Sequence, residues 1–285
     1  MKFFLSGLGN WFTDLDLITK AVIEADKLGF YGALMPDHYM WGETDWNKRP
    51  DRNYTLETWT TLTYLGAKTE QIHLGTLVTP IPFRPPAILA KMLSTLDVLS
   101  NGRVVLGVGA GWSQPEFEGY SEWNTPKVRV DKTIEGIELM IKLWTQDKVT
   151  FNGKHYKTNN TILEPKPAQK PYPKLLFGGK GKRMLKLAAK YADICYIPPW
   201  NGTETRETAK QLVLTEAKKH GRADKIAFMA NGTASEGSYN SKEYSTRVEK
   251  AVEENAAHFL VSFPRNSEYI NTVKKFAREV MPSFR

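Results

Sequence analysis

An aspartate and a histidine stand side by side directly after a short apolar segment. Residues 31–35 are predicted to form a β-strand, and Asp37 and His38 follow at its carboxyl end. A carboxylate can accept hydrogen bonds from a ring N–H or a hydroxyl, and an imidazole can exchange a proton near neutral pH. The pair is therefore a candidate for proton transfer to a reacting atom. An aspartate that caps a turn and a histidine packed beneath the next loop explain the same residues equally well.

A second candidate is the glycine-rich segment that contains Gly178, Gly179 and Lys180, between a strand predicted over 174–177 and a helix predicted over 182–191. Backbone amides at the start of a helix are free to bind an anion. Cations at the start of this helix, with no acid beside them, oppose the helix dipole by about 0.3–1 kcal/mol each, and a bound anion would reverse that cost. The segment is predicted to hold a phosphate group rather than to be an ordinary glycine-rich turn.

Two further segments end predicted strands. One contains Leu77, Val78 and Thr79, which could support one face of a flat ring, although the spacing alone favours simple strand core. The other contains Gly109 and ends at Trp112. It resembles a dinucleotide-binding fingerprint only superficially, because no helix begins directly after it. Its glycines would instead allow the backbone to approach a bulky ligand, against which Trp112 would lie.

Strand-like and helix-like segments alternate along the whole chain and position these candidates. The predicted strands cover residues 2–8, 31–35, 72–79, 103–109, 174–177, 193–197, 227–231 and 258–262. The predicted helices cover residues 14–28, 55–68, 85–99, 130–144, 182–191, 205–220, 242–255 and 267–280.

Such an alternation predicts a parallel sheet of the α/β class. The number of strand–helix pairs in a chain of 285 residues fits a closed (β/α)8 TIM barrel with insertions better than an open doubly wound sheet. We expect one domain over 1–285, with a hairpin and proline-rich excursion at about 148–173. In such a barrel the loops after the strands carry the chemistry, and the two longest are rich in aromatic residues.

Composition narrows the functional classes. The net charge is +8, but the basic residues are dispersed, which favours a mildly basic surface over nucleic-acid binding. No apolar run is long enough to span a membrane, and the single cysteine, Cys195, lies in an apolar run typical of a small buried hydrophobe. A chain that can form no internal disulfide suits the cytoplasm. The five histidines lie far apart in sequence and no metal-binding motif is present, so we expect no metal.

Taken together, several of these segments resemble the luciferase-like monooxygenase family, which includes flavin-dependent monooxygenases and enzymes that use the deazaflavin coenzyme F420. The resemblance is carried by an ordered set that spans nearly the whole chain, namely residues 25–30, 36–38, 74–76, 85–91, 96–103, 106–112 and 276–282. The fold of that family is the barrel expected here.

The resemblance implies how a cofactor would be held. The tricyclic ring would lie over a bulge after the third strand, with a non-prolyl cis peptide between Leu77 and Val78. Asp37 and His38 would lie near the reactive face of the ring. The cofactor-binding residues would be Asp37, Leu77, Val78, Thr79, Gly109, Trp112, Phe177, Gly178, Gly179 and Lys180. Trp112 stands where the sugar-phosphate dehydrogenases of the family have a glutamate, which argues against a sugar-phosphate substrate.

Three functional hypotheses follow. The first is an F420-dependent oxidoreductase that transfers a hydride between the deazaflavin and a small organic substrate, with His38 and Asp37 as its catalytic residues. The second is a monooxygenase that uses reduced flavin mononucleotide (FMNH2) supplied by a separate reductase. The third is a barrel that binds a flavin or phosphorylated ligand without turnover. Members of the family are commonly dimers, so a homodimer is expected.

Overall fold

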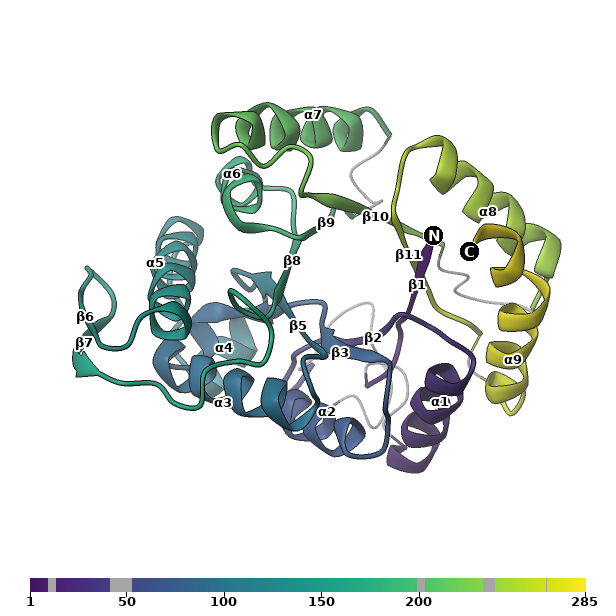
Figure 1. Cartoon of the computed structure of the whole chain (residues 1–285), viewed down its shortest axis with the longest axis horizontal. Helices are drawn as coiled ribbons and strands as arrows, with labels where there is room; N and C mark the ends of the chain where they lie inside the picture. The colour runs from purple at the N-terminus through teal and green to yellow at the C-terminus, as the bar shows by residue number, and fades with distance from the viewer. Residues whose placement is uncertain (10–13, 42–52, 199–202, 233–238, 265) are drawn as a thin grey trace.

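The computed structural model describes residues 1–9, 14–41, 53–198, 203–232, 239–264 and 266–285. A closed barrel of eight parallel strands forms the centre of the molecule, as predicted, and helices surround it (Figure 1). The barrel strands are β1 (Lys2–Leu5), β2 (Gly32–Met35), β3 (His73–Thr76) with its continuation β4 (Thr79–Pro80), β5 (Val104–Gly109), β8 (Lys174–Gly178), β9 (Ile194–Tyr196), β10 (Ala227–Asn231) and β11 (His258–Val261).

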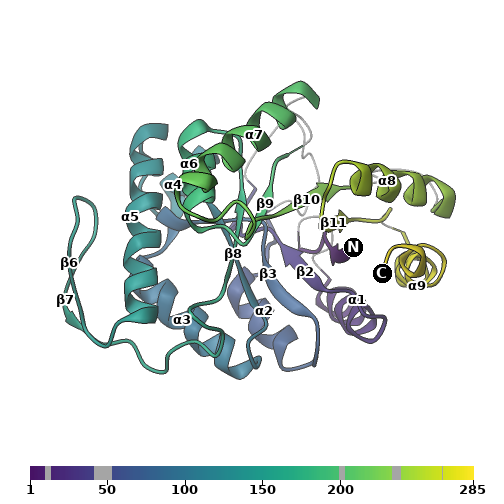
Figure 2. The ribbon, with the colours of Figure 1, turned by 45° about the horizontal axis from the view of Figure 1, so that its top comes forward.

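The α-helices alternate with these strands. They are α1 (Leu15–Lys27), α2 (Thr58–Gly66), α3 (Pro86–Leu99), α4 (Gln114–Tyr120), α5 (Pro126–Thr145), α6 (Lys182–Tyr191), α7 (Thr203–Lys219), α8 (Ser241–Glu253) and α9 (Tyr269–Glu279). Two short 3-10 helices, η1 (Ile81–Phe83) and η3 (Met281–Phe284), complete the set. Figure 2 shows the helical ring from a tilted direction.

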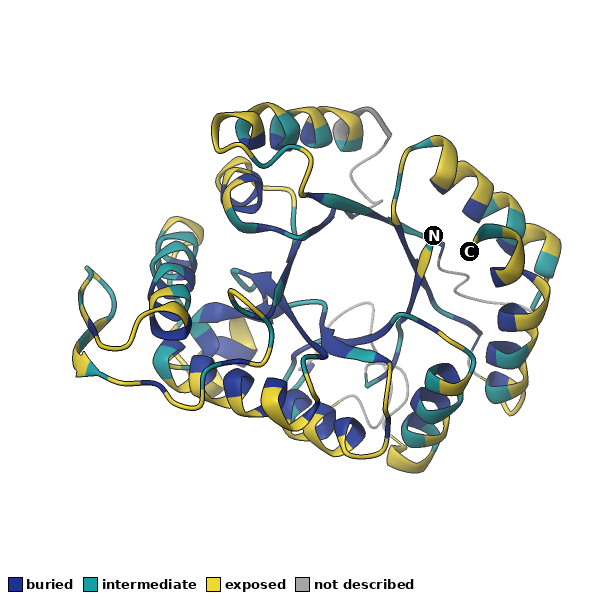
Figure 3. Cartoon of the chain, viewed as in Figure 1, coloured by how far each residue is buried: buried dark blue, intermediate teal, exposed yellow. Residues whose placement is uncertain are grey.

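The barrel strands are mostly buried (Figure 3), and their alternating side chains build two apolar layers. Outward-facing residues such as Phe3 and Leu5 pack against the helices in the larger core. Inward-facing residues fill the barrel interior, and they are Phe4, Leu34, Val105, Leu176, Ile194, Tyr196, Met229 and Leu260. The strands therefore read as nearly continuous apolar runs, as expected for a parallel sheet covered by helices.

The predicted bounds of the helices and strands agree with the observed ones to within a few residues, and two further differences concern the site. The strand expected over 72–79 is interrupted after Thr76, where the peptide bond between Leu77 and Val78 is cis as the resemblance implied, and pairing resumes at β4. The loop expected after the fourth strand contains helix α4, which begins at Gln114 with a proline in its first turn. The excursion at 148–173 is present as the hairpin β6 (Val149–Asn152) and β7 (Lys157–Thr161), which projects beside α5 in Figure 2.

Closure of the barrel depends on a close approach between β3 and β5. A methyl group on Gly107 would lie 1.9 Å from the carbonyl oxygen of Thr76, and one on Gly75 would lie 2.2 Å from that of Val105. The glycines therefore allow the two backbones to approach where the sheet closes. The buried guanidinium of Arg103 ties the same region together through hydrogen bonds to the carbonyls of Gly66, Thr69, Ile72 and Ser100.

We expect Gly107→Ala to lower the free energy of unfolding by about 3 kcal/mol or more, because the added methyl group overlaps backbone that cannot move independently. Gly181→Ala is the control, since nothing lies within 4 Å of an added methyl group there. Urea unfolding of both variants measures the difference. Equal stability of Gly107→Ala and wild type would show that the strands can separate at no cost.

Candidate functional site

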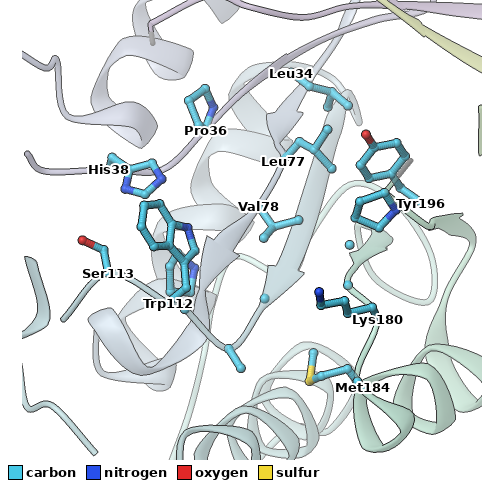
Figure 4. Close-up of a pocket in the computed structure, with 18 of the residues that line it drawn as sticks. Leu34, Pro36, His38, Leu77, Val78, Trp112, Ser113, Lys180, Met184 and Tyr196 are labelled. Carbon is cyan, nitrogen blue, oxygen red and sulfur yellow. The ribbon is translucent and has the colours of Figure 1, made fainter. Parts of the chain in front are cut away.

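A cavity of about 850 Å³ opens at the carboxyl ends of the barrel strands. Of the residues predicted to form the site, it is lined by His38, Leu77, Val78, Gly109, Trp112, Gly178, Gly179 and Lys180. In Figure 4, His38 and Trp112 lie on one side of the cavity, and Lys180 and Met184 lie on the other. The structure therefore brings together the loop after β2 and the glycine-rich segment after β8, which lie far apart in the sequence.

The interrupted strand supplies an apolar surface inside this cavity. Leu77 and Val78 follow β3, and their side chains project into the cavity in Figure 4. Val78 rests on two glycines of neighbouring strands: a methyl group on Gly109 would lie 2.4 Å from one of its methyl carbons, and one on Gly178 would lie 2.8 Å from the other. These two glycines thus seat Val78, a packing role that the sequence did not reveal.

His38 is held by a carboxylate that sequence reasoning missed. Its Nδ1 atom lies 2.7 Å from Oε2 of Glu116 on α4, and the other carboxylate oxygen accepts a hydrogen bond from the backbone N–H of Tyr39. Glu116 is fully buried. Because a carboxylate accepts hydrogen bonds, Nδ1 carries a proton and Nε2 is the ring nitrogen left for a ligand. The only available signal in the sequence was an acidic residue in a loop that was not assigned a helix.

Aromatic rings enclose the same histidine. The ring centre of Trp41 lies 3.9 Å from that of His38, and Trp112 meets it edge-on at 5.7 Å. Trp112 retains 54% of its exposed surface and lies at the rim of the cavity. The predicted aromatic wall is therefore present as far as residue 41. Trp46, which also belongs to the predicted loop, lies outside the described residues.

Asp37 does not line the cavity. It is fully buried and accepts two hydrogen bonds from the guanidinium of Arg84, at 2.7 and 2.9 Å, and a third from the hydroxyl of Thr79. Burial alone would lower the pKa of Arg84, but its pairs with Asp37 and Glu57 raise that pKa above its ordinary value. Asp37 and Thr79 therefore support the β2 loop from behind, through an ion pair with Arg84 that the sequence did not indicate.

Phe177 is likewise outside the cavity lining and packs in the outer core, although it precedes Gly178 in β8. The glycine-rich segment itself leads into α6, whose first turn carries no acidic residue. A carboxylate nevertheless reaches that turn from α5, because Asp131 forms an ion pair with Arg183. Arg183 is thus neutralised locally, while Lys180 projects into the cavity (Figure 4).

The opposite wall contributes polar groups that were not predicted. The hydroxyl of Tyr196, at the end of β9, accepts a hydrogen bond from the side-chain amide of Asn231 on β10 at 3.1 Å. Burial raises the pKa of Tyr196 to about 12, so its hydroxyl keeps its proton near neutral pH. Outside the cavity, Cys195 is buried as predicted, and burial raises the pKa of its thiol to about 12, which makes it unreactive.

Comparisons with known proteins identify the family. The model of the family described as "Luciferase-like monooxygenase" matches residues 8–281. The chain belongs to this family.

Among curated members, the chain is 30% identical over 218 residues to an FMNH(2)-dependent dimethylsulfone monooxygenase of Pseudomonas putida, covering 76% of the chain and 58% of that relative. It is 33% identical over 174 residues to an F420-dependent glucose-6-phosphate dehydrogenase of Intrasporangium calvum, covering 60% and 48%. The chain thus spans about half the length of these relatives.

Solved structures match over the whole chain. An F420-dependent secondary alcohol dehydrogenase in complex with an F420-acetone adduct superposes with a TM-score of 0.80 at 22% identity, covering 100% of this chain and 99% of that one. The coenzyme F420 dependent tetrahydromethanopterin reductase of Methanopyrus kandleri gives 0.79 at 17% identity, with the same coverage. At these identities the likeness establishes the barrel fold of the family.

No helix within the described residues is long and apolar enough to cross a membrane. The same part of the chain contains no group of three or more histidine, cysteine or acidic side chains placed to hold a metal ion.

Arg84→Met should lower the free energy of unfolding by about 3–5 kcal/mol, because it leaves Asp37 as a buried charge without its ion-pair partner. Denaturation in urea measures the loss. The double variant Asp37→Leu, Arg84→Met serves as the control and should regain much of the stability, since it removes both charges. A loss below about 1 kcal/mol in the single variant would mean that Asp37 is not held by this pair.

Proposed function

We propose that the protein is an F420-dependent oxidoreductase that transfers a hydride between the deazaflavin and a small organic substrate. The observation that carries the proposal is one cavity that combines an apolar platform, a carboxylate-held imidazole and a glycine-rich helix start. The F420-dependent relatives of the same family support the choice of cofactor. When bound, the deazaflavin supplies the hydride chemistry.

Each group of residues that lines the cavity would then have a separate role in binding the cofactor or in proton transfer. Leu77 and Val78 would support one face of a flat ring system, and the backbone at Gly178 and Gly179 together with Lys180 would bind a phosphate. His38 would give or take a proton at Nε2, while Glu116 fixes the orientation of its ring. The aromatic rings of Trp41 and Trp112 would limit the access of water to that proton.

An FMNH2-dependent monooxygenase is the second candidate. It is favoured by the Pseudomonas putida relative, which aligns with a larger share of the chain than the Intrasporangium calvum dehydrogenase does. The same platform and phosphate-binding segment would suit a flavin, and a separate reductase would then supply FMNH2. The homodimer, the cytoplasmic location and the single domain over 1–285 remain predictions from the sequence.

Fluorescence titration with F420, FMN and FMNH2 separates the candidates. The proposal predicts saturable binding of F420 at low micromolar concentration and F420-coupled turnover of a small organic compound. Tight binding of FMNH2 without binding of F420 would reject it in favour of the monooxygenase. Cofactor binding with no cofactor-coupled activity, in wild type and in His38→Ala alike, would make the barrel a binding protein without turnover.

Glu116→Gln should lower turnover about 100-fold while leaving cofactor affinity unchanged, because an amide can accept only one of the two hydrogen bonds that the carboxylate takes from His38 and Tyr39, and the imidazole is then no longer held in place. Glu118→Gln on the same helix is the control, since Glu118 is exposed and bonds Gln114 instead. Steady-state kinetics and cofactor titration of both variants give the two readouts. If Glu116→Gln turned over at the wild-type rate, Glu116 would have no part in positioning His38 for proton transfer.

A further inference from the structure

Arg129 is a buried cation in the wall of the cavity. It lies on α5, retains only 7% of its exposed surface and lines the cavity. Its guanidinium lies over the ring of Trp123 at 4.0 Å and near that of Phe117 at 5.9 Å, and it donates one hydrogen bond to the carbonyl of Asn124. These contacts hold the guanidinium in place but bring no negative charge to it.

The charge of Arg129 has no ion-pair partner among the residues that the structure describes. Its Nε atom is buried and makes no hydrogen bond there. Burial lowers the pKa of Arg129, and no carboxylate offsets this. An arginine in such surroundings is costly unless an anion compensates its charge, since an aromatic face supplies only part of the lost hydration.

The other charged residues that line the cavity also favour an anionic ligand. Lys180 is a second cation among the residues that line the cavity, and Glu116 contributes a carboxylate to the same lining. Both oxygens of Glu116 are already engaged, one by His38 and one by the backbone of Tyr39. A ligand in the cavity therefore meets positive charge that the wall itself does not neutralise.

The side-chain contacts of Arg129 lie on the α4 side of the cavity, although Asp131, two residues further along α5, pairs with Arg183 at the start of α6. The contacts of Arg129 come from α4 and from the residues that join α4 to α5, whereas Gly178 and Gly179 join β8 to α6. Phe117, one of its aromatic neighbours, follows Glu116 directly in α4. The helix that holds His38 through Glu116 thus also borders Arg129.

We propose that Arg129 binds an anionic group of the substrate, such as a carboxylate or a sulfonate, and so selects anionic organic substrates. The inference rests on the proposed function and adds the substrate class to it. Two anionic groups would then occupy the cavity: the phosphate of the cofactor at the glycine-rich segment, and the oxyanion of the substrate at Arg129. A guanidinium suits the second role because it donates two parallel hydrogen bonds to one oxyanion.

The first test is a titration of the cofactor-free protein with sulfate, in which the NMR signal of the Arg129 Nε–H group is monitored. That signal is assigned by its disappearance in Arg129→Lys. We expect a saturable shift in wild type, and calorimetry should show at least a tenfold loss of sulfate affinity in Arg129→Met. An Arg129 signal that does not respond to sulfate in wild type would overturn the proposal, whether or not Arg129→Met folds.

The second test separates substrate from cofactor, using FMN and riboflavin as probes that differ by one phosphate. Arg129→Met should bind both as wild type does, whereas Lys180→Met should lose affinity for FMN and keep it for riboflavin. A loss of FMN affinity alone in Arg129→Met would overturn the substrate assignment, because Arg129 would then serve the phosphate. Failure of wild type to bind any flavin or deazaflavin would instead remove the proposed function, while the sulfate result would stand.

Discussion

The seating of Val78 between two glycines determines what the carboxyl end of this barrel can hold. The chain turns inward after β3, and Val78 fits there only because Gly109 and Gly178 carry no side chains. A larger residue at either glycine would displace Val78 and remove the apolar platform from the centre of the cavity. The two strands that seat the platform, β5 and β8, also lead directly to Trp112 and to the glycine-rich segment, so one packing constraint positions three parts of the site.

Charges are arranged in two shells around this platform. Behind the β2 loop, Asp37 and Arg84 form an ion pair outside the cavity lining, and the partly exposed Glu57 also pairs with Arg84. Facing the cavity, His38 is paired with Glu116, while Arg129 and Lys180 remain open to a ligand. The ion pair of Asp37 and Arg84 supports the backbone from which His38 extends, and Arg129 and Lys180 outnumber Glu116 among the charged residues that line the cavity. Adjacent residues 37 and 38 thus serve different purposes because their side chains leave the strand end in different directions.

The sequence predicted the architecture well because the fold depends on patterns that local residues carry. Apolar runs between helical segments indicated the strands, and both the cis bond at Leu77–Val78 and the buried state of Cys195 agree with expectation. The site was predicted less completely. Asp37 and Thr79 proved to be interior supports, and Glu116, Arg129 and Tyr196 were missed, since their positions depend on the packing of α4, α5 and the late strands. No local pattern distinguishes a carboxylate that will meet a histidine 78 positions away.

The central claim is that a planar redox cofactor lies on the Leu77–Val78 platform between His38 and the glycine-rich segment. A crystal structure of the protein with F420 or FMN bound tests it most directly. The account predicts the ring system stacked on Val78, its reactive edge toward Nε2 of His38, and its phosphate at the amides of Gly178 and Gly179. A ring bound elsewhere, or one whose phosphate lies beside Glu116 with the reactive edge toward Lys180, would contradict it.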